Sequence, residues 1–311
     1  MHRRLRRWIV AAGAVVAPLT LGACGLEPKS GHALVTITVT RDFGARRLAS
    51  VTVPRGDSTE TMAQLLRGSL HARLAPDGSL ESIEGLRTGG SDRWFVYING
   101  ISASLAPLEL KRTKVHPGDA VWWDLHDTTA TATVRAVVGE YPEPFAHGSA
   151  GRRLPTTLQC APDTKSACDT VSSALSADKL PIAISLLGTG SGQDSLSVVV
   201  GKWSDLTPQL VARLVEHGPD ASGIYAKFVA GGAALQLLDA RAKVVRTLHA
   251  GAGLVAATSD SQSKPTWLIT GTDAAGVDAA ARALTAADLR RHFAVAVSAG
   301  SPIALPVPGV G

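Results

Sequence analysis

Four side chains on two expected strands have the types and spacing to bind a flat ligand. Alternation along the expected strand 120–125 places Trp122, Asp124 and the following His126 on one face, and Tyr97 of the expected strand 94–98 can share it. Aromatic rings bordered by a carboxylate and an imidazole form a platform with polar edges, which suits flat ligands, sugars or a partner's surface. The alternative is that a second domain or a loop covers this face.

The elements that position these residues are those of a mixed sheet with one helix. Val121, Trp123 and Leu125 alternate with the first set and belong under that helix. In chain order, β-branched alternation and helical spacing predict strands at 33–40 and 49–53, a helix at 59–70, and strands at 80–86, 94–98 and 120–125. A single helix on one face of such a sheet is the β-grasp pattern, so we expect an α+β fold.

Two motifs in this region resemble the transcobalamin C-terminal-like domain family. The first is Trp94-Phe-Val-Tyr-Ile-Asn-Gly100, a tryptophan-led strand that ends in Asn-Gly. The second is Pro117-Gly-Asp-Ala-Val-Trp-Trp123, a Gly-Asp turn followed by a strand that bears tryptophan. The resemblance implies a β-grasp domain, which agrees with the order of the expected elements.

The resemblance also implies a ligand and a partner. In the eukaryotic carriers this domain forms one wall of a cobalamin site, and bacterial members are commonly attached to the cell surface, some linked to vitamin uptake. Cobalamin or another vitamin, delivered to a membrane transporter, is therefore the implied cargo. The carriers close their site with a large helical domain, and this sequence has no such helical array. His116 and His126 are either ligands for a metal or a corrin cobalt, or plain polar surface.

The second part of the chain alternates strands and helices, which predicts a separate α/β domain. The expected strands are 180–187, 195–200, 224–229, 233–238, 244–248, 253–257, 266–270 and 293–297, and the expected helices are 205–216, 277–284 and 286–292. Two glycine-rich phrases, 187–192 and 271–276, lack the lysine of a phosphate-binding loop and are predicted as plain turns.

The first residues are typical of an export signal. Four arginines within residues 3–7 precede an apolar run from Trp8 to Leu21, which is too short for a comfortable membrane span. Leu21-Gly-Ala-Cys24 resembles the lipobox of bacterial lipoproteins, in which the cysteine is lipidated and becomes the first residue. We therefore expect a chain anchored by Cys24 on the extracytoplasmic face of the membrane, the alternative being an ordinary secretory signal.

These patterns divide the chain into six expected segments. They are a signal peptide at 1–23, a tether at 24–30, the β-grasp domain at 31–138, a Pro- and Gly-rich linker at 139–153, the α/β domain at 154–297 and a flexible tail at 298–311.

The two remaining cysteines, Cys160 and Cys168, are expected to form a disulfide. Thiols tend to pair outside the cytoplasm, and no histidine lies near them in the sequence to complete a metal site. A bridge over so short a loop contributes roughly 2–3 kcal/mol. Metal binding and free thiols are the alternatives.

Charge and motifs favour binding over catalysis. The formal net charge is +5, but residues 1–23 hold four arginines and no acid, so +1 remains after their removal. Without a clustered basic face we expect no nucleic-acid partner. The arginine pairs 152–153 and 290–291 are predicted to be solvated surface. No catalytic motif is present, and the expected functions are small-ligand binding, an envelope structural or interaction role, or an unrecognised hydrolase.

Overall fold

The computed structural model describes residues 34–54, 59–192, 194–260 and 264–309. Residues from His32 onward form one compact unit of mixed helices and strands, so the α+β class is confirmed. The expected signal peptide, Cys24 and the tether lie outside the described residues.

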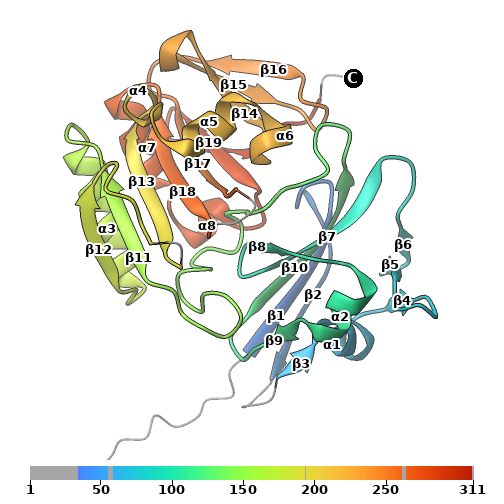
Figure 1. Ribbon diagram of the computed structural model, residues 1–311. Helices are drawn as coiled ribbons and strands as arrows, with labels where there is room; N and C mark the ends of the chain where they lie inside the picture. Colours follow the sequence, from blue (N-terminus) through green and yellow to red (C-terminus); the bar gives the residue numbers. More distant parts are fainter. Residues whose placement is uncertain (1–33, 55–58, 193, 261–263, 310–311) are drawn as a thin grey trace, which may run out of the picture. The chain divides into compact units, whose positions relative to one another are not determined.

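The first part of the unit is a five-stranded sheet (Figure 1). Its strands, in spatial order, are β2 (Arg46–Pro54), β1 (Leu34–Arg41), β10 (Ala120–Asp127), β7 (Asp92–Ile98) and β8 (Ile101–Ala103). β1 and β10 are parallel and the other neighbours are antiparallel. The smaller strands are β3 (Glu60–Thr61), β4 (Ala72–Leu74), β5 (Leu80–Ile83), β6 (Leu86–Arg87) and β9 (Lys114–Val115).

One face of this sheet is covered by α1 (Met62–Ser69) and α2 (Pro107–Arg112). Thr61 caps α1, because its hydroxyl accepts a hydrogen bond from the Gln64 backbone N–H. The Gln64 side chain in turn accepts one from the Thr61 backbone N–H. Val121, Trp123 and Leu125 are buried in the same apolar core as Leu65 and Leu66 of α1. The predicted division of the β10 side chains between its two faces is therefore confirmed.

The second part is built around a seven-stranded sheet. In spatial order its strands are β12 (Ile182–Leu186), β11 (Thr156–Cys160), β13 (Leu196–Lys202), β18 (Thr266–Gly271), β17 (Gly253–Thr258), β19 (Ala294–Ser298) and β20 (Ser301–Leu305). The first four are mutually parallel, and each of the last three is antiparallel to the strand before it in this order.

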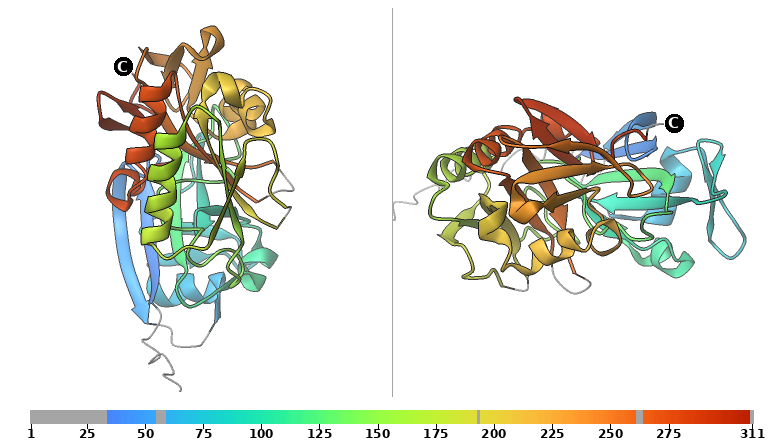
Figure 2. Two further views of the ribbon diagram at one scale, coloured as in Figure 1. Left: turned by 90° about the vertical axis from the view of Figure 1, so that its left-hand side faces the viewer. Right: turned by 90° about the horizontal axis from the view of Figure 1, so that it is seen from above.

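Helices α3 (Lys165–Ala177) and α7 (Ala274–Arg282) lie side by side on one face of the second sheet (Figure 2). The other face carries a three-stranded sheet and short helices: β14 (Ala226–Val229), β15 (Ala234–Leu238), β16 (Val244–Leu248), α4 (Trp203–Leu206), α5 (Leu210–Glu216), α6 (Pro219–Ser222) and η1 (Ala230–Gly232). The short helix α8 (Ala286–Leu289) precedes β19.

The two parts share a core. Tyr97 and Trp122 of the first sheet lie in the same buried cluster as Leu254 and Leu268 of the second sheet and Leu235 of the three-stranded sheet. The expected platform face is thus covered by the second half of the chain, which was the alternative prediction. Burial of these apolar side chains is the driving force that joins the halves.

Two expected boundaries are wrong. The predicted linker 139–153 is not exposed: Tyr141 and Phe145 are buried, and the Phe145 ring lies 5.0 Å from that of Trp267. The predicted flexible tail 298–311 contains β20, which pairs with β19 and buries Leu305. Pro302 is tolerated because β20 is the edge strand of its sheet.

Candidate functional site

The four residues predicted to bind a ligand are together but inaccessible. Trp122 pairs with Tyr97 across β10 and β7, and Asp124 and His126 share their face. All four are at most 1% exposed. Phe293 lies against this face, with its ring centroid 5.1–5.6 Å from those of Trp122, Tyr97 and His126. The prediction of an open platform is wrong because Phe293 and its neighbours occupy the place of the ligand.

Asp124 organises this buried face. Its carboxylate accepts hydrogen bonds from the Thr40 hydroxyl, from the backbone N–H of Phe43 at 3.1 Å and from that of Gly44 at 2.9 Å. His126 Nδ1 lies 2.8 Å from the same carboxylate. Several donors around a buried carboxylate compensate for its loss of water. Asp124 therefore holds the turn between β1 and β2 against β10.

His126 is sandwiched between two rings and has one free nitrogen. Its ring stacks on Phe43 and Phe95 with centroid distances of 4.3 and 4.1 Å. Among the described residues, its Nε2 has no hydrogen-bond partner, and the same is true of the hydroxyls of Tyr97 and Tyr225. Burial raises the pKa of Tyr97 well above its usual range, and the charge of Asp124 adds to the shift. No serine, threonine or cysteine of the described chain bonds His126, so this Asp–His couple lacks a nucleophile.

A hollow of about 280 Å³ opens at the edge of the covered face, and Trp122 forms part of its wall. We call it the arginine pocket. It is lined by Thr36, Thr38, Arg47, Ser50, Ala120, Trp122, Gly139, Glu140, Arg290 and Arg291. These residues come from β1, β2, β10, the segment after Val138 and the turn after α8, so both halves of the chain build it.

The polar groups of the arginine pocket are mainly hydrogen-bond donors. Within the described part of the chain, the guanidinium groups of Arg47, Arg290 and Arg291 have no ion-pair partner, and the buried Nε of Arg291 has no hydrogen-bond partner. A buried donor without an acceptor is costly, and a bound acceptor would remove that cost. Hydroxyls from β1 and β2 add further donors.

The single carboxyl of the arginine pocket belongs to Glu140. It accepts a hydrogen bond from the backbone N–H of Gly100. Burial raises its pKa well above the usual range, against the lowering effect of that bond, and repulsion from Glu143 and Asp119 adds to the rise. The carboxyl therefore resists ionisation, which leaves the arginine charges dominant in the pocket.

The turn that carries Arg290 and Arg291 is held in a restricted conformation. Arg291 has a φ of 60°, in the left-handed region, and its N–H bonds Gly139 O at 3.0 Å. A Cβ at Gly44 would lie 1.9 Å from Arg291 O, and one at Gly139 would lie 2.7 Å from His292 N. Such conformations persist where the surroundings enforce them, often at functional sites. The two glycines thus let the turn approach closely enough to aim its arginines at the pocket.

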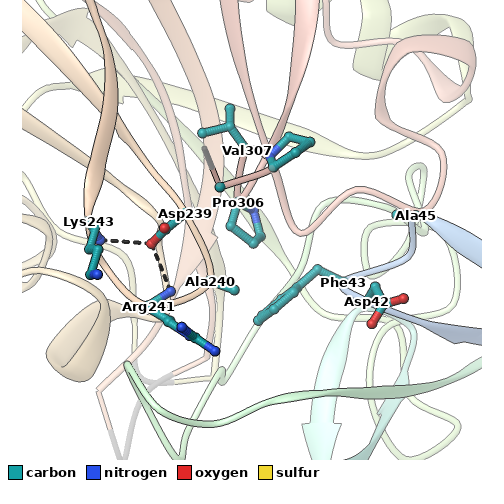
Figure 3. Close-up of a pocket in the computed structure, with 11 residues that line it drawn as sticks. Asp42, Phe43, Ala45, Asp239, Ala240, Arg241, Lys243, Pro306 and Val307 are labelled. Atoms are coloured by element: carbon teal, nitrogen blue, oxygen red, sulfur yellow. Dashed lines mark hydrogen bonds between the residues drawn. The ribbon is translucent and has the colours of Figure 1, made fainter. Parts of the chain in front are cut away.

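A larger hollow of about 450 Å³, the turn pocket, lies between the β1–β2 turn, the β15–β16 turn and residues 306–309 (Figure 3). Several of its polar groups already have hydrogen-bond or ion-pair partners in the protein. Asp239 accepts bonds from the backbone N–H groups of Arg241 and Lys243 within its own turn, and Asp42 pairs with Arg41. Acids and bases are mixed here, so the turn pocket lacks the single sign of charge that the arginine pocket has.

Sequence reasoning found Trp122 but not the arginines beside it. The prediction that Arg290 and Arg291 are only solvated surface is incomplete, because they line a pocket with residues that lie at least 150 positions earlier in the chain. The sequence signal for this site was the pair of arginines directly after a short capped helix.

The Cys160–Cys168 disulfide is confirmed, with a Cα–Cα distance of 6.0 Å. The phrase 271–276 is a turn whose Asp273 caps α7.

No family model matches the chain, and no curated protein matches it.

In the part of the chain that is described, no three His, Cys, Asp or Glu side chains are grouped so as to hold a metal ion. None of the described helices is both long enough and apolar enough to cross a membrane.

Proposed function

We propose that this protein is a lipid-anchored, extracytoplasmic binding protein that captures a small anionic ligand in the arginine pocket, without catalysis. The observation that carries the proposal is that three guanidinium groups without an ion-pair partner among the described residues line one hollow, together with an aromatic wall. Arginine binds carboxylates and phosphates in a fixed, bidentate geometry. A hollow of about 280 Å³ is near the lower end of ligand sites, which favours a compact ligand.

The first part of the chain is proposed to be a transcobalamin C-terminal-like β-grasp domain. The parallel pairing of β1 with β10, the antiparallel hairpins beside them and the helices on one face support this assignment. The corrinoid version of the function has less support, because the aromatic residues of this face are covered. Cyanocobalamin is therefore a ligand to be tested beside compact anions.

Anchoring through Cys24 is supported by the sequence Leu21-Gly-Ala-Cys24 and the arginine-led apolar run before it. Stable attachment needs more than one acyl chain. An anchored binding protein would deliver its ligand to a membrane transporter, which is the proposed partner. Mass spectrometry of the membrane-extracted protein tests the anchor, because Cys24 would carry acyl groups and Cys24→Ser would abolish them.

Calorimetric titration tests the ligand site. The chain from residue 24 onward, carrying Cys24→Ser, is titrated with inorganic phosphate, a phosphomonoester, a tricarboxylate and cyanocobalamin. We expect a compact anion to bind, and Arg291→Gln to weaken it by about 10-fold or more through loss of a charged hydrogen bond. Arg246→Gln removes an exposed arginine that does not line the pocket and should leave binding unchanged. Absence of binding by every anion, or equal weakening by both variants, would contradict the proposal.

A structural or interaction role in the envelope is the second proposed function. The edge strand β12 supports it, since Ile184 and Leu186 are 61% and 70% exposed there. Exposed apolar edge strands pair readily with other chains. A concentration-dependent increase in size by light scattering, abolished by Ile184→Lys, would favour this function.

A further inference from the structure

A second hollow of about 440 Å³ lies at the end of the first sheet where the described chain begins. We call it the β9 pocket. It is lined by Ile98, Ile101, Ser102, Ala103, Arg112, Thr113, Lys114, His116, Ser149 and Ala150. The β7–β8 hairpin forms one side of the pocket, and the end of α2 with β9 forms another.

The β9 pocket combines cations with an apolar wall. Arg112 and Lys114 are exposed and have no ion-pair partner among the described residues, and no carboxylate lines the pocket. His116 Nδ1 is buried without a hydrogen-bond partner, 3.6 Å from an Asp119 carboxylate that already accepts bonds from Asn99 and the His116 N–H. Side chains of β7 and β8, among them Ile98 and Ile101, also line the pocket. The pocket thus suits an anion attached to an apolar group.

The position of the β9 pocket relates it to the anchor. The backbone N–H of Thr36, near the start of β1, bonds Asp119 O at 3.2 Å, so the chain enters the unit beside the turn that leads from β9 into β10. Figure 1 shows β3, β9, α1 and α2 at the same end as the start of β1. Leu34 follows Cys24 by ten positions, and such a stretch spans at most about 35 Å. An acylated Cys24 would therefore keep this end close to the membrane.

Helix α2 presents a matching surface. Leu108 is 59% exposed and lies four residues before Arg112, on the same face of the helix. Apolar side chains beside basic ones are the pattern of surfaces that rest in the headgroup region of a bilayer. Lys111 in the last turn of α2 adds another cation.

We propose that the β9 pocket binds the anionic headgroup of a phospholipid in the membrane that holds the anchor, with Arg112, Lys114 and His116 around the phosphate. Leu108 would enter the acyl boundary beside it. The inference rests on the anchored state proposed above, and it adds a second, reversible contact that orients the protein. The arginine pocket plays no part in it.

Vesicle binding by the unacylated chain tests the inference. The chain from residue 32 onward, which is the compact unit, is sedimented with vesicles of equal parts phosphatidylglycerol and phosphatidylcholine, and with vesicles of phosphatidylcholine alone. Each cation near an anionic surface strengthens attachment by about fivefold, so Arg112→Gln/Lys114→Gln should weaken it by about 25-fold. Leu108→Ser should weaken it on the same vesicles without any change in charge.

Matched variants separate this contact from general charge attraction. Lys227→Gln/Arg246→Gln removes the same charge from exposed positions on β14 and β16 and should retain anionic-vesicle binding. Circular dichroism checks that every variant is folded. The inference would be overturned if both double variants lost vesicle binding equally, if the parent bound both vesicle types equally, or if it bound neither. It would also be overturned if soluble glycerol phosphate saturated the pocket while no vesicle was bound. Arg291→Gln should not alter vesicle binding, so failure here is distinct from failure of the ligand site.

Discussion

Glu140 shows how one side chain connects the arginine pocket to the shared core. Its carboxyl accepts a hydrogen bond from the backbone N–H of Gly100 and faces the negative groups of Glu143 and Asp119. Burial and these charges raise its pKa, which means that its ionised form is disfavoured in the folded chain. The residue therefore opposes folding whenever the solution is basic enough to ionise it.

Replacing Glu140 by Gln should make stability less dependent on pH. The folded-state pKa lies above the unfolded value of 4.5, so the carboxyl contributes most stability below that value and loses it as pH rises through the folded pKa. The unfolding free energy of Glu140→Gln should equal that of the parent at about pH 4 and exceed it at about pH 8. Urea unfolding at both pH values measures this, with the exposed Glu81→Gln as control. A less stable Glu140→Gln at the higher pH would contradict the expectation.

At the scale of elements, the disulfide ties a strand to the helix that follows it. Cys160 is the last residue of β11 and Cys168 lies in the first part of α3, which packs on the second sheet. Closing this short loop limits the unfolded chain more than the folded one. The bridge therefore fixes where α3 begins relative to β11.

Removing the bridge should lower the unfolding free energy by roughly 2–3 kcal/mol. Cys160→Ala/Cys168→Ala is compared with the parent by urea unfolding under oxidising conditions. The parent with reductant should fall to about the level of the double variant, which separates loss of the bridge from loss of the two side chains. An oxidised parent no more stable than the double variant would contradict this role.

At the scale of the whole molecule, the two sheets behave as one structure because they share a core. Phe293 of the second half is 2% exposed and touches rings from β7, β10 and the β1–β2 turn. Such a side chain stabilises both halves at once. Neither half buries its own facing surface without the other.

Phe293→Ala should destabilise the entire unit by about 3–5 kcal/mol. Tryptophan fluorescence and far-ultraviolet circular dichroism should report one coincident unfolding transition, before and after the substitution. Leu186→Ala, at an exposed position on β12, should change little. Two separate transitions, only one of them shifted by Phe293→Ala, would show that the halves fold independently.

Local patterns predicted much of the fold but not its assembly. Alternation in β10 and helical spacing in α1 correctly identified which side chains of the first sheet lie under the helix and which lie on its other face. The expected helix 205–216 is interrupted at Pro208, which separates α4 from α5. Strand β11 and helix α3 were not predicted, because the serines and threonines of α3 weaken its apolar stripe.

The candidate site was predictable only in part for a related reason. Trp122 stood out because aromatic residues are 5% of the chain and cluster in this region. Its covering by Phe293 and its closeness to Arg291 depend on contacts between distant segments. A single sequence carries periodicity along one element, whereas it carries no direct record of which faces meet.

The cover over the aromatic face also has a consequence for the order in which the chain is made. Phe293 follows Trp122 by 171 residues, so a chain that emerges from its amino terminus delivers the bare face long before the residue that shields it. During that interval an apolar surface that includes Tyr97, Trp122 and Phe43 is uncovered and prone to aggregation. A chaperone that binds apolar surfaces would therefore be needed most after the middle third of the chain has been made and before Phe293 follows.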